Sequence, residues 1–397
     1  MADTMATPNL GTEMMEDRDR VHFPALRRAR RDRVLAAMRD LDLDACVLGR
    51  EDNVRYASGA RRLWTASSRP FVPTCLILRD RDEVQLLSFS ASYEGIPEEV
   101  LPDDFFPVTW NPMNFVERFS STEGTAQARR VGFDGLSPFF EGLMREAFPV
   151  AEFVAAEAMM RELRRVKLPD EIVCLRTAAA IAESALYATA VEVRPGVTEK
   201  HLQATFLDRM CELGTSQFAQ QGTFTQIDPG GGMRWITGER TLDEGAMVAL
   251  AGGVLWAGYE GSLARTWWCA HQRRPTGAHR GLYQQWREVI TPVVAACRPG
   301  ADGATLRAAY EGAGGEPAGP TLAYSLGLGH EGPVAGGGLS PAGERGQQLV
   351  AGMVLGVRVL VTGTEGGYLG EEMVVVTDDG PELLTTLGHG ALAGSEA

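Results

Sequence analysis

The chain has 397 residues, of which 44% are hydrophobic and 23% charged, which is an ordinary globular balance with enough length for two hydrophobic cores. The formal net charge of −14 argues against nucleic acid as the main partner, because phosphate binding needs clustered cations. Its one basic cluster, Arg27 to Arg33, falls in an amphipathic stretch, where a solvated helix face is expected.

Cysteine spacing, the length of the apolar runs and the N-terminal residues indicate the cellular compartment. Six scattered cysteines include no closely spaced pair, which excludes a CxxC zinc site and indicates buried free thiols in a reducing cytoplasm. No apolar run reads as a membrane helix, and no membrane partner is expected. Residues 1–20 lack the apolar core of a signal peptide and are expected to be a disordered lead-in.

Helix and strand patterns alternate in the N-terminal half. Apolar residues at helical spacing predict a helix from Pro24 to Leu41. Short apolar runs predict strands at 45–49, 74–78 and 84–89. This alternation is typical of an α/β layer architecture and thins out near Ala155, so we place a smaller α/β domain at residues 21–158.

The pattern changes to long helices over a sheet in residues 159–397, which predicts an α+β domain. An alanine-rich helix is expected from Asp170 to Val193, ended by Pro195-Gly196. Thr198 is the expected N-cap of a second helix, which ends at Gly214. Further strands are predicted at 247–250, 353–360 and 373–376, and further helices at 283–297 and 304–311.

Four segments in order resemble the creatinase, aminopeptidase P and prolidase family. They are RELRRVKLPDEIVCLRTAAAIAESAL, RPGVTEKHL, EGAMVALAGGVLWAGYEGSLARTWW, and the pair VAGMVLGVRV and GEEMVVVTDDGPELLT. The order and spacing match over about residues 25 to 387. The resemblance implies a C-terminal pita-bread catalytic-type domain preceded by a creatinase-type N-terminal domain.

The N-terminal half carries one further likeness. The SRPF segment resembles the Gly-Arg-Pro-Tyr of creatinase, whose arginine reaches into the partner's active site and holds a substrate carboxylate. Arg69 is therefore the candidate clamp, with Trp64 lining the cleft beside it. A homodimer follows from this resemblance. The alternatives are a surface arginine before a proline turn and a tryptophan that only packs.

The metal ligands of the peptidase members do not carry over onto this chain. The two aspartates fall on Ala251 and Ser262, the histidine on Tyr324, the first glutamate on Arg358 and the last on Glu371. One carboxylate therefore remains of five ligands, and a cation stands where another would be. No metal and no other cofactor are expected.

Creatinase also works without metals, but its pocket is not retained either. Its histidine falls near Arg234, and its two glutamates fall on Ala264 and Arg358. A pocket that has exchanged carboxylates for arginines favours an anionic substrate over a guanidinium compound.

The expected substrate-binding residues are Trp64, Arg69, Arg234, Tyr259 and Arg358, and the expected catalytic residues are Glu260, Tyr324, His330, Glu371 and Glu372. His330 in GLGHEGP resembles the family's second histidine and suits proton transfer, or is a hydrogen-bonded loop residue. Glu371 is a general base beside Arg358, or the two form an ion pair that replaces the metal as a strut. Glu260 faces the substrate or lies on an exposed turn.

The sequence supports three functions. The first is a metal-independent enzyme that uses acid–base catalysis on a small anionic amino-acid or carboxylate derivative, by C–N bond hydrolysis, elimination or isomerisation. The second is a non-catalytic binding module, a pseudopeptidase. The third is a metal-dependent Xaa-Pro peptidase-like hydrolase whose ligands lie elsewhere. New functional groups in place of the ligands favour the first.

Overall fold

The computed structural model describes residues 21–60, 74–88, 96–107, 113–215, 217–230, 232–316, 321–329, 331–336, 344 and 346–392. These residues divide into two compact units between Arg164 and Arg165, beyond the expected boundary at 158. The helix that closes the first unit explains the later boundary, because its buried Arg164 forms an ion pair with Asp52 of the same unit. The expected lead-in, residues 1–20, lies outside the described residues.

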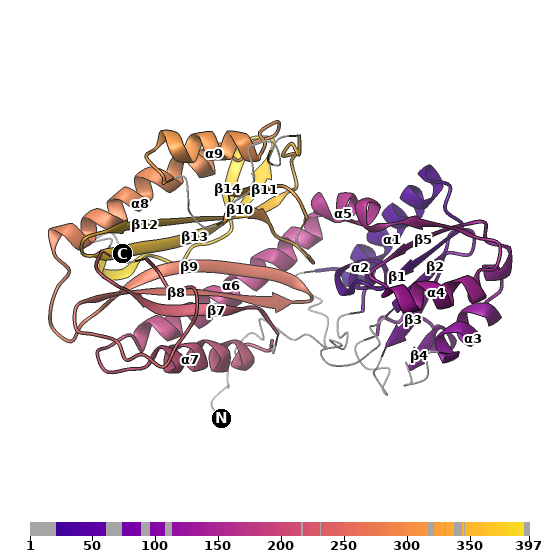
Figure 1. Cartoon of the computed structure of the whole chain (residues 1–397), viewed down its shortest axis with the longest axis horizontal. Coiled ribbons are helices and arrows are strands. Elements are labelled where there is room, and N and C mark those ends of the chain that lie inside the picture. Colours follow the sequence, from indigo (N-terminus) through magenta and orange to yellow (C-terminus); the bar gives the residue numbers. More distant parts are fainter. Residues whose placement is uncertain are drawn as a thin grey trace, which may run out of the picture. The chain divides into compact units, whose positions relative to one another are not determined.

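The N-terminal unit is an α/β layer structure (Figure 1). Its strands are β1 (Ala45–Leu48), β2 (Thr74–Leu78), β3 (Glu83–Ser88), β4 (Phe105–Pro107), β5 (Arg130–Asp134) and β6 (Glu152–Ala155), in the order β4-β3-β2-β1-β5-β6. Its helices are α1 (Phe23–Asp40), α2 (Glu51–Ser58), α3 (Met113–Ser121), α4 (Pro138–Ala147) and α5 (Glu157–Arg165). The strands expected at 45–49, 74–78 and 84–89 are confirmed.

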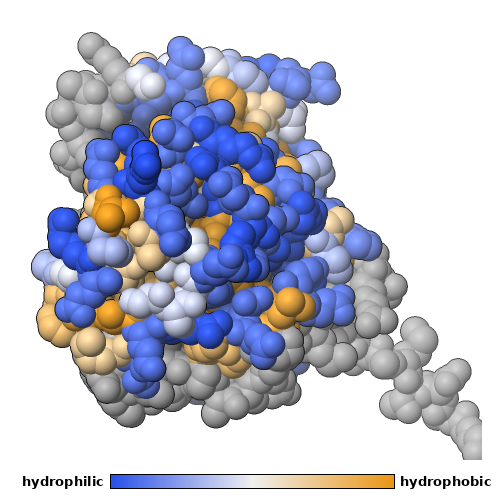
Figure 2. All heavy atoms as spheres, turned by 90° about the vertical axis from the view of Figure 1, so that its right-hand side faces the viewer, coloured by the Kyte–Doolittle hydropathy of each residue, from blue (hydrophilic) through white to orange (hydrophobic). Residues whose placement is uncertain are grey.

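Packing in this unit follows the strand pattern. Strands β1 and β2 are buried throughout, as expected of central strands covered on both faces. Aromatic side chains of α3 and α4 close the core, with Phe115 and Phe119 rings 4.4 Å apart. On the face seen in Figure 2, hydrophilic residues cover most of the described surface and hydrophobic ones are scattered among them.

The C-terminal unit is built on one 8-stranded sheet in the order β11-β10-β12-β13-β9-β8-β7, with β14 paired to β13. The strands are β7 (Phe218–Ile227), β8 (Ala246–Trp256), β9 (Tyr259–Cys269), β10 (Thr321–Ser325), β11 (Val334–Gly336), β12 (Val354–Gly363), β13 (Gly366–Thr377) and β14 (Gly380–Leu383). The helices are α6 (Pro169–Val191), α7 (Glu199–Glu212), α8 (Gly277–Ala295) and α9 (Gly303–Gly312). All four helices were predicted; β7, β9, β10, β11 and β14 were not.

The helices cover the outer face of this sheet in two pairs, with α6 and α7 against one half and α8 and α9 against the other (Figure 1). Glycines show how close the helices come. A Cβ on Gly261 of β9 would lie 2.2 Å from the Ala178 backbone of α6, and one on Gly370 of β13 would lie 2.3 Å from Trp286 of α8. Because side chains alternate along a strand, the residues on either side of each of these glycines point to the opposite, inner face of the sheet.

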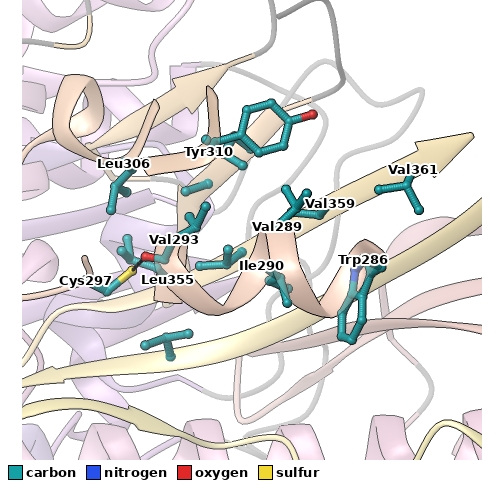
Figure 3. Close-up of a cluster of buried hydrophobic side chains, with 14 of the residues drawn as sticks. Trp286, Val289, Ile290, Val293, Cys297, Leu306, Tyr310, Leu355, Val359 and Val361 are labelled. Atoms are coloured by element: carbon teal, nitrogen blue, oxygen red, sulfur yellow. Dashed lines mark hydrogen bonds between the residues drawn. The ribbon is translucent and has the colours of Figure 1, made fainter. Parts of the chain in front are cut away.

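The largest core fills the space between α8, α9 and the outer face of the strands. Figure 3 shows Val289, Ile290 and Val293 of α8 directed at Leu355 and Val359 of β12. These residues recur at three- and four-residue spacing on the helix and at two-residue spacing on the strand. Because Leu355 and Val359 are held in this core, the residues that alternate with them on β12 point to the inner face of the sheet.

Helix α6 is long and apolar enough to cross a membrane, by length and composition alone, with a mean hydropathy of 1.3 over 18 residues. The sequence prediction of no such run is corrected on this point. More than half of that window, 56%, is buried inside the unit against β8 and β9. The apolar composition is thus that of a core helix. The cysteines are free thiols, buried except for the exposed Cys211.

Candidate functional site

Strand register brings the positions onto which the resemblance places the family's metal ligands together on the inner face of the C-terminal sheet. Glu371 of β13 pairs with Arg358 of β12 on one side and with Ala264 of β9 on the other. Ala264 in turn pairs with Ala251 of β8. Tyr324 pairs with Gly356, so it lies beside the same stretch of β12. Residues far apart in the sequence are therefore neighbours on one surface.

Four side chains on this face are in contact, and we call them the inner-face cluster: Ser262, Tyr324, Arg358 and Glu371. Glu371 lies at its centre. Its carboxylate is fully buried and accepts a hydrogen bond from Arg358 Nε on Oε2. Tyr324 donates to the other oxygen, Oε1, at 2.7 Å. Tyr324 Oη also lies 3.4 Å from Arg358 Nη2 and 3.3 Å from the Ser262 hydroxyl. Both carboxylate oxygens are thus engaged.

Charge within the inner-face cluster fixes the protonation of two members. Burial lowers the pKa of Arg358, but the negative charge of Glu371, together with smaller contributions from Tyr324, the hydrogen bond to Glu371 and the charge of Glu260, outweighs burial and raises it, so the guanidinium stays charged. Burial, and then the charge of Glu371, raise the pKa of the Tyr324 hydroxyl well above its usual value. Tyr324 is therefore a permanent hydrogen-bond donor near neutral pH.

Glu260 lies on the same face of β9 as Ser262, two residues away. It is buried, and its backbone N–H donates to the Gly327 carbonyl at 3.0 Å. Its charge contributes to the raised pKa of both Tyr324 and Arg358, which places the carboxylate within electrostatic reach of them. The expectation that Glu260 faces the cleft is supported by this placement, and an exposed turn is excluded.

Gln220 is a member of the site that the sequence did not indicate. Its Nε2 donates to the Ser262 hydroxyl at 3.0 Å and so connects β7 to the inner-face cluster. No pattern in the sequence marked this residue, because β7 itself was not predicted.

The inner-face cluster does not fit a pair of divalent metal ions. A methyl group at Ala251, hydroxyls at Ser262 and Tyr324 and a cation at Arg358 replace four anionic or imidazole donors. The remaining carboxylate, Glu371, is already neutralised by Arg358. Within the described part of the chain, no group of three or more His, Cys, Asp or Glu side chains could hold a metal ion.

Glu372 does not belong to this site, contrary to the sequence expectation. As the next residue on β13 it points to the opposite, outer face. There its Oε2 accepts from Arg265 Nη2 at 2.9 Å and from the Thr385 hydroxyl, and its Oε1 lies 3.8 Å from His389 Nε2. Arg265 also donates to the Glu371 carbonyl at 2.7 Å, so this outer pair fixes the backbone that carries Glu371.

Tyr259 and Arg234 are likewise held in other places. Tyr259 donates to Glu171 Oε1 at 2.8 Å, and this bond joins β9 to the first turn of α6. Arg234 Nη2 pairs at 2.5 Å with Glu199, a fully buried carboxylate at the start of α7, and lies 3.2 Å from Thr225 Oγ1. Among the residues that the structure describes, neither side chain forms a hydrogen bond with the inner-face cluster, and their substrate-binding roles stay predictions.

A second unpredicted contact lies at the end of β10. Lys167 Nζ pairs at 3.3 Å with Glu331, and both side chains are buried. Lys167 also lies 3.5 Å from the hydroxyl of Ser325, the neighbour of Tyr324. The expected His330, Arg69 and Trp64 lie outside the described residues.

Comparisons with known proteins agree with this architecture. Residues 173–378 match the model of metallopeptidase family M24, and residues 30–166 match the creatinase/prolidase N-terminal domain. The first match covers more than half of the chain, which therefore belongs to metallopeptidase family M24. The fold is the predicted one, a pita-bread domain preceded by a creatinase-type domain.

Individual relatives are distant. An uncharacterized peptidase of Staphylococcus aureus is 23% identical over 361 residues, which cover 89% of this chain and 97% of the relative. The prolidase from Pyrococcus horikoshii OT3 has a TM-score of 0.73 at 19% identity, covering 91% of this chain and 99% of that one. An Xaa-Pro dipeptidase from Bacillus anthracis has a TM-score of 0.71 at 21% identity, covering 90% and 97%. These two likenesses concern the fold alone.

Proposed function

We propose that this family M24 chain is a metal-independent hydrolase-like enzyme that binds a small carboxylate, such as an amino-acid derivative, on the inner face of its C-terminal sheet. The observation that carries the proposal is the largely buried Arg358, whose raised pKa keeps it charged and which is bound to Glu371. Cleavage of a C–N bond is the reaction that family membership favours.

Arg358 supplies the carboxylate site. A guanidinium has five N–H groups, and Nε and Nη2 are directed at Glu371 and Tyr324. The Nη1 end makes no hydrogen bond within the described part of the chain, and the side chain is 14% exposed. A substrate carboxylate can therefore reach Nη1 while the Glu371 pair stays intact.

The proton-transfer role falls to Glu260 and His330. Both oxygens of Glu371 already accept hydrogen bonds, which makes Glu371 the residue that holds Arg358 rather than the base. Glu260 is a carboxylate on the same face and within electrostatic reach of the inner-face cluster. Tyr324, kept protonated by its surroundings, donates a hydrogen bond and does not serve as a base.

Binding and catalysis are tested separately. Acetate and creatine are titrated calorimetrically into the protein after treatment with a chelator. We expect acetate, and not creatine, to bind, and the Arg358→Gln/Glu371→Gln double variant to lose the acetate heat while staying folded. Arg287→Gln, on α8 at the outer face, is the matched control and binds as the wild type does. Acetate binding that survives loss of Arg358 would refute the assigned anion site.

Turnover is then measured on a panel of N-substituted amino acids. We expect hydrolysis in chelator, lowered at least a hundredfold by Glu260→Gln with acetate affinity retained. Activity that appears only after Mn²⁺ or Co²⁺ is added, together with stoichiometric metal by elemental analysis, would refute metal independence and support the metal-dependent peptidase function instead.

A specific observation favours one alternative, a non-catalytic binding module. Arg358, Glu371 and Tyr324 satisfy one another, as in a strut that replaces the metal ions. Acetate binding with no turnover of any panel member would support this alternative.

A further inference from the structure

An apolar surface lies next to the inner-face cluster. Its members share the inner face and come from strands β7, β8, β9, β12 and β13 and the segment after β7: Ile227, Met233, Ala249, Ala251, Ala264, Leu369 and the partly buried Leu360. Ala264 pairs with Glu371, and Leu360 is two residues beyond Arg358 on the same face of β12. The charged group and the apolar surface are therefore contiguous.

This surface continues into a cavity of about 360 Å³. Leu360 and Met233 belong to both, and Trp235 extends the apolar part of the lining. Tyr310 and Val361 reach the cavity from the outer-face core, and Gln285, Glu316 and Thr362 give it polar groups. Both Tyr310, on α9, and Val361, near the C-terminal end of β12, are labelled in Figure 3. The pairing of β12 with β10 covers Leu355 to Val357, so the cavity lies where β12 runs on past that pairing.

Arg234 keeps the wall of the cavity in place. It stands between Met233 and Trp235 and is tied to buried Glu199 and to Thr225. The backbone of the same segment is held by the Gly238 N–H, which donates to Glu199 Oε2 at 2.8 Å. Met233 and Trp235 consequently line the cavity, while Arg234 between them is bonded to Glu199 and Thr225. Trp235 is 44% exposed, so its ring is accessible to a molecule that enters the cavity.

We infer that the molecule bound at Arg358 carries a bulky apolar group, and that this group occupies the cavity lined by Met233, Leu360 and Trp235. The inference rests on the proposed function, since Arg358 fixes the carboxylate end. It deepens that function by naming the substrate class: an aryl or branched-alkyl carboxylate, with the apolar body about two residues along β12 from the charged group.

Calorimetric titration of acetate, phenylacetate and benzyl alcohol tests the inference. Phenylacetate adds a ring that the cavity would remove from water, so we expect it to bind at least tenfold more tightly than acetate. Benzyl alcohol, which lacks the carboxylate, is expected to bind at least tenfold more weakly than phenylacetate.

Variants separate the two ends of the site. Leu360→Asn is expected to weaken phenylacetate binding at least fivefold and to leave acetate binding within twofold. Trp235→Ala is the second variant, which keeps the test decisive if Leu360→Asn does not fold, because Trp235 is half exposed. Ile236→Ala is the matched control, since Ile236 is 70% exposed and does not line the cavity.

The outcomes distinguish this inference from the proposed function. Acetate and phenylacetate of equal affinity, both dependent on Arg358, would overturn the apolar subsite and leave the proposed anion site standing. A wild-type protein that binds neither would overturn the anion site, and the subsite with it. Phenylacetate binding that is unaffected by both cavity variants would place its ring elsewhere and overturn the subsite.

Discussion

At the residue scale, the ion pair between Arg358 and Glu371 joins β12 to β13 at the candidate site. At positions onto which the resemblance places metal ligands, this chain has an ion pair between Arg358 and the buried Glu371, and Tyr324 donates a hydrogen bond to Glu371. Such pairs contribute little net stability relative to apolar replacements, but removal of one partner leaves a buried charge without compensation. Replacing both residues together is therefore expected to cost less unfolding free energy than replacing one of them.

This asymmetry gives a prediction for stability. Arg358→Met is expected to lower the free energy of unfolding by about 3 kcal/mol, because Glu371 loses its counter-charge. The Arg358→Met/Glu371→Leu double variant is expected to recover most of that loss. Urea denaturation of the wild type, both single variants and the double variant gives the coupling energy. Additive effects of the two substitutions would contradict an energetically coupled pair.

His389 predicts how stability depends on pH. Burial, followed by the charges of Arg265 and Arg287, lowers its pKa to about 3, despite Glu372 Oε1 at 3.8 Å. The unfolded chain binds a proton below about pH 6.5 that the folded chain does not, so stability falls as the pH drops from about 6.5 towards 3. His389→Gln should remove this contribution.

Urea denaturation at pH 7.5 and 5.5 measures the effect. The loss of unfolding free energy between the two values is expected to be about 1 kcal/mol larger in wild type than in His389→Gln. His201→Gln, at an exposed position on α7, should behave as the wild type does. A His389→Gln variant with the wild-type pH dependence would show that the folded protein protonates His389.

Close contact between helices and the sheet is the determining feature at the element scale. Gly370 lets α8 place Trp286 directly on β13, and Trp286 Nε1 lies 3.4 Å from the Gly370 carbonyl. The inner face of the same strand carries Glu371 one residue later. The position of α8 therefore bears on the site through the strand between them.

Gly370→Ala tests this contact. The added methyl group would overlap the Trp286 ring, so we expect a loss of about 1–3 kcal/mol of unfolding free energy. Trp286→Leu introduced together with it should relieve part of the loss. Gly281→Ala on α8, where a Cβ meets open space, is the control and should stabilise the protein by up to about 1 kcal/mol. Equal stabilities of Gly370→Ala and wild type would show that α8 moves freely.

Assembly is the question at the scale of the whole molecule. The resemblance of SRPF to the creatinase clamp predicts a homodimer in which Arg69 completes the partner's cleft. Light scattering is expected to give twice the mass of the chain. Mixed dimers of Arg69→Ala with the Arg358→Gln/Glu371→Gln variant should recover one acetate site per dimer, because one cleft then has both arginines. A monomer, or mixed dimers without binding, would contradict the shared site.

The sequence patterns alone predicted an α/β domain followed by an α+β domain, because helix periodicity, caps and buried strands are local signals. The pita-bread architecture was implied by the resemblance of four segments to the family. Helices α1, α6, α7, α8 and α9 fall where their spacing predicts them. Strands β7, β9 and β10 carry a weaker signal, since their polar and glycine residues are explained by pairing partners distant in the chain. The positions of the family's metal ligands came from the resemblance, and the absence of a bound metal stays a prediction.

The tertiary structure alone decided which side chains meet. Glu371 and Glu372 are adjacent carboxylates that the sequence treated alike, and strand alternation sends one to the inner face and the other to Arg265 on the outer face. Arg234 was expected in the cleft, and only the structure shows that it pairs with the buried Glu199. The sequence determines the donors and acceptors available, whereas strand register and burial determine which of them share a surface, because that depends on contacts across more than a hundred residues of chain.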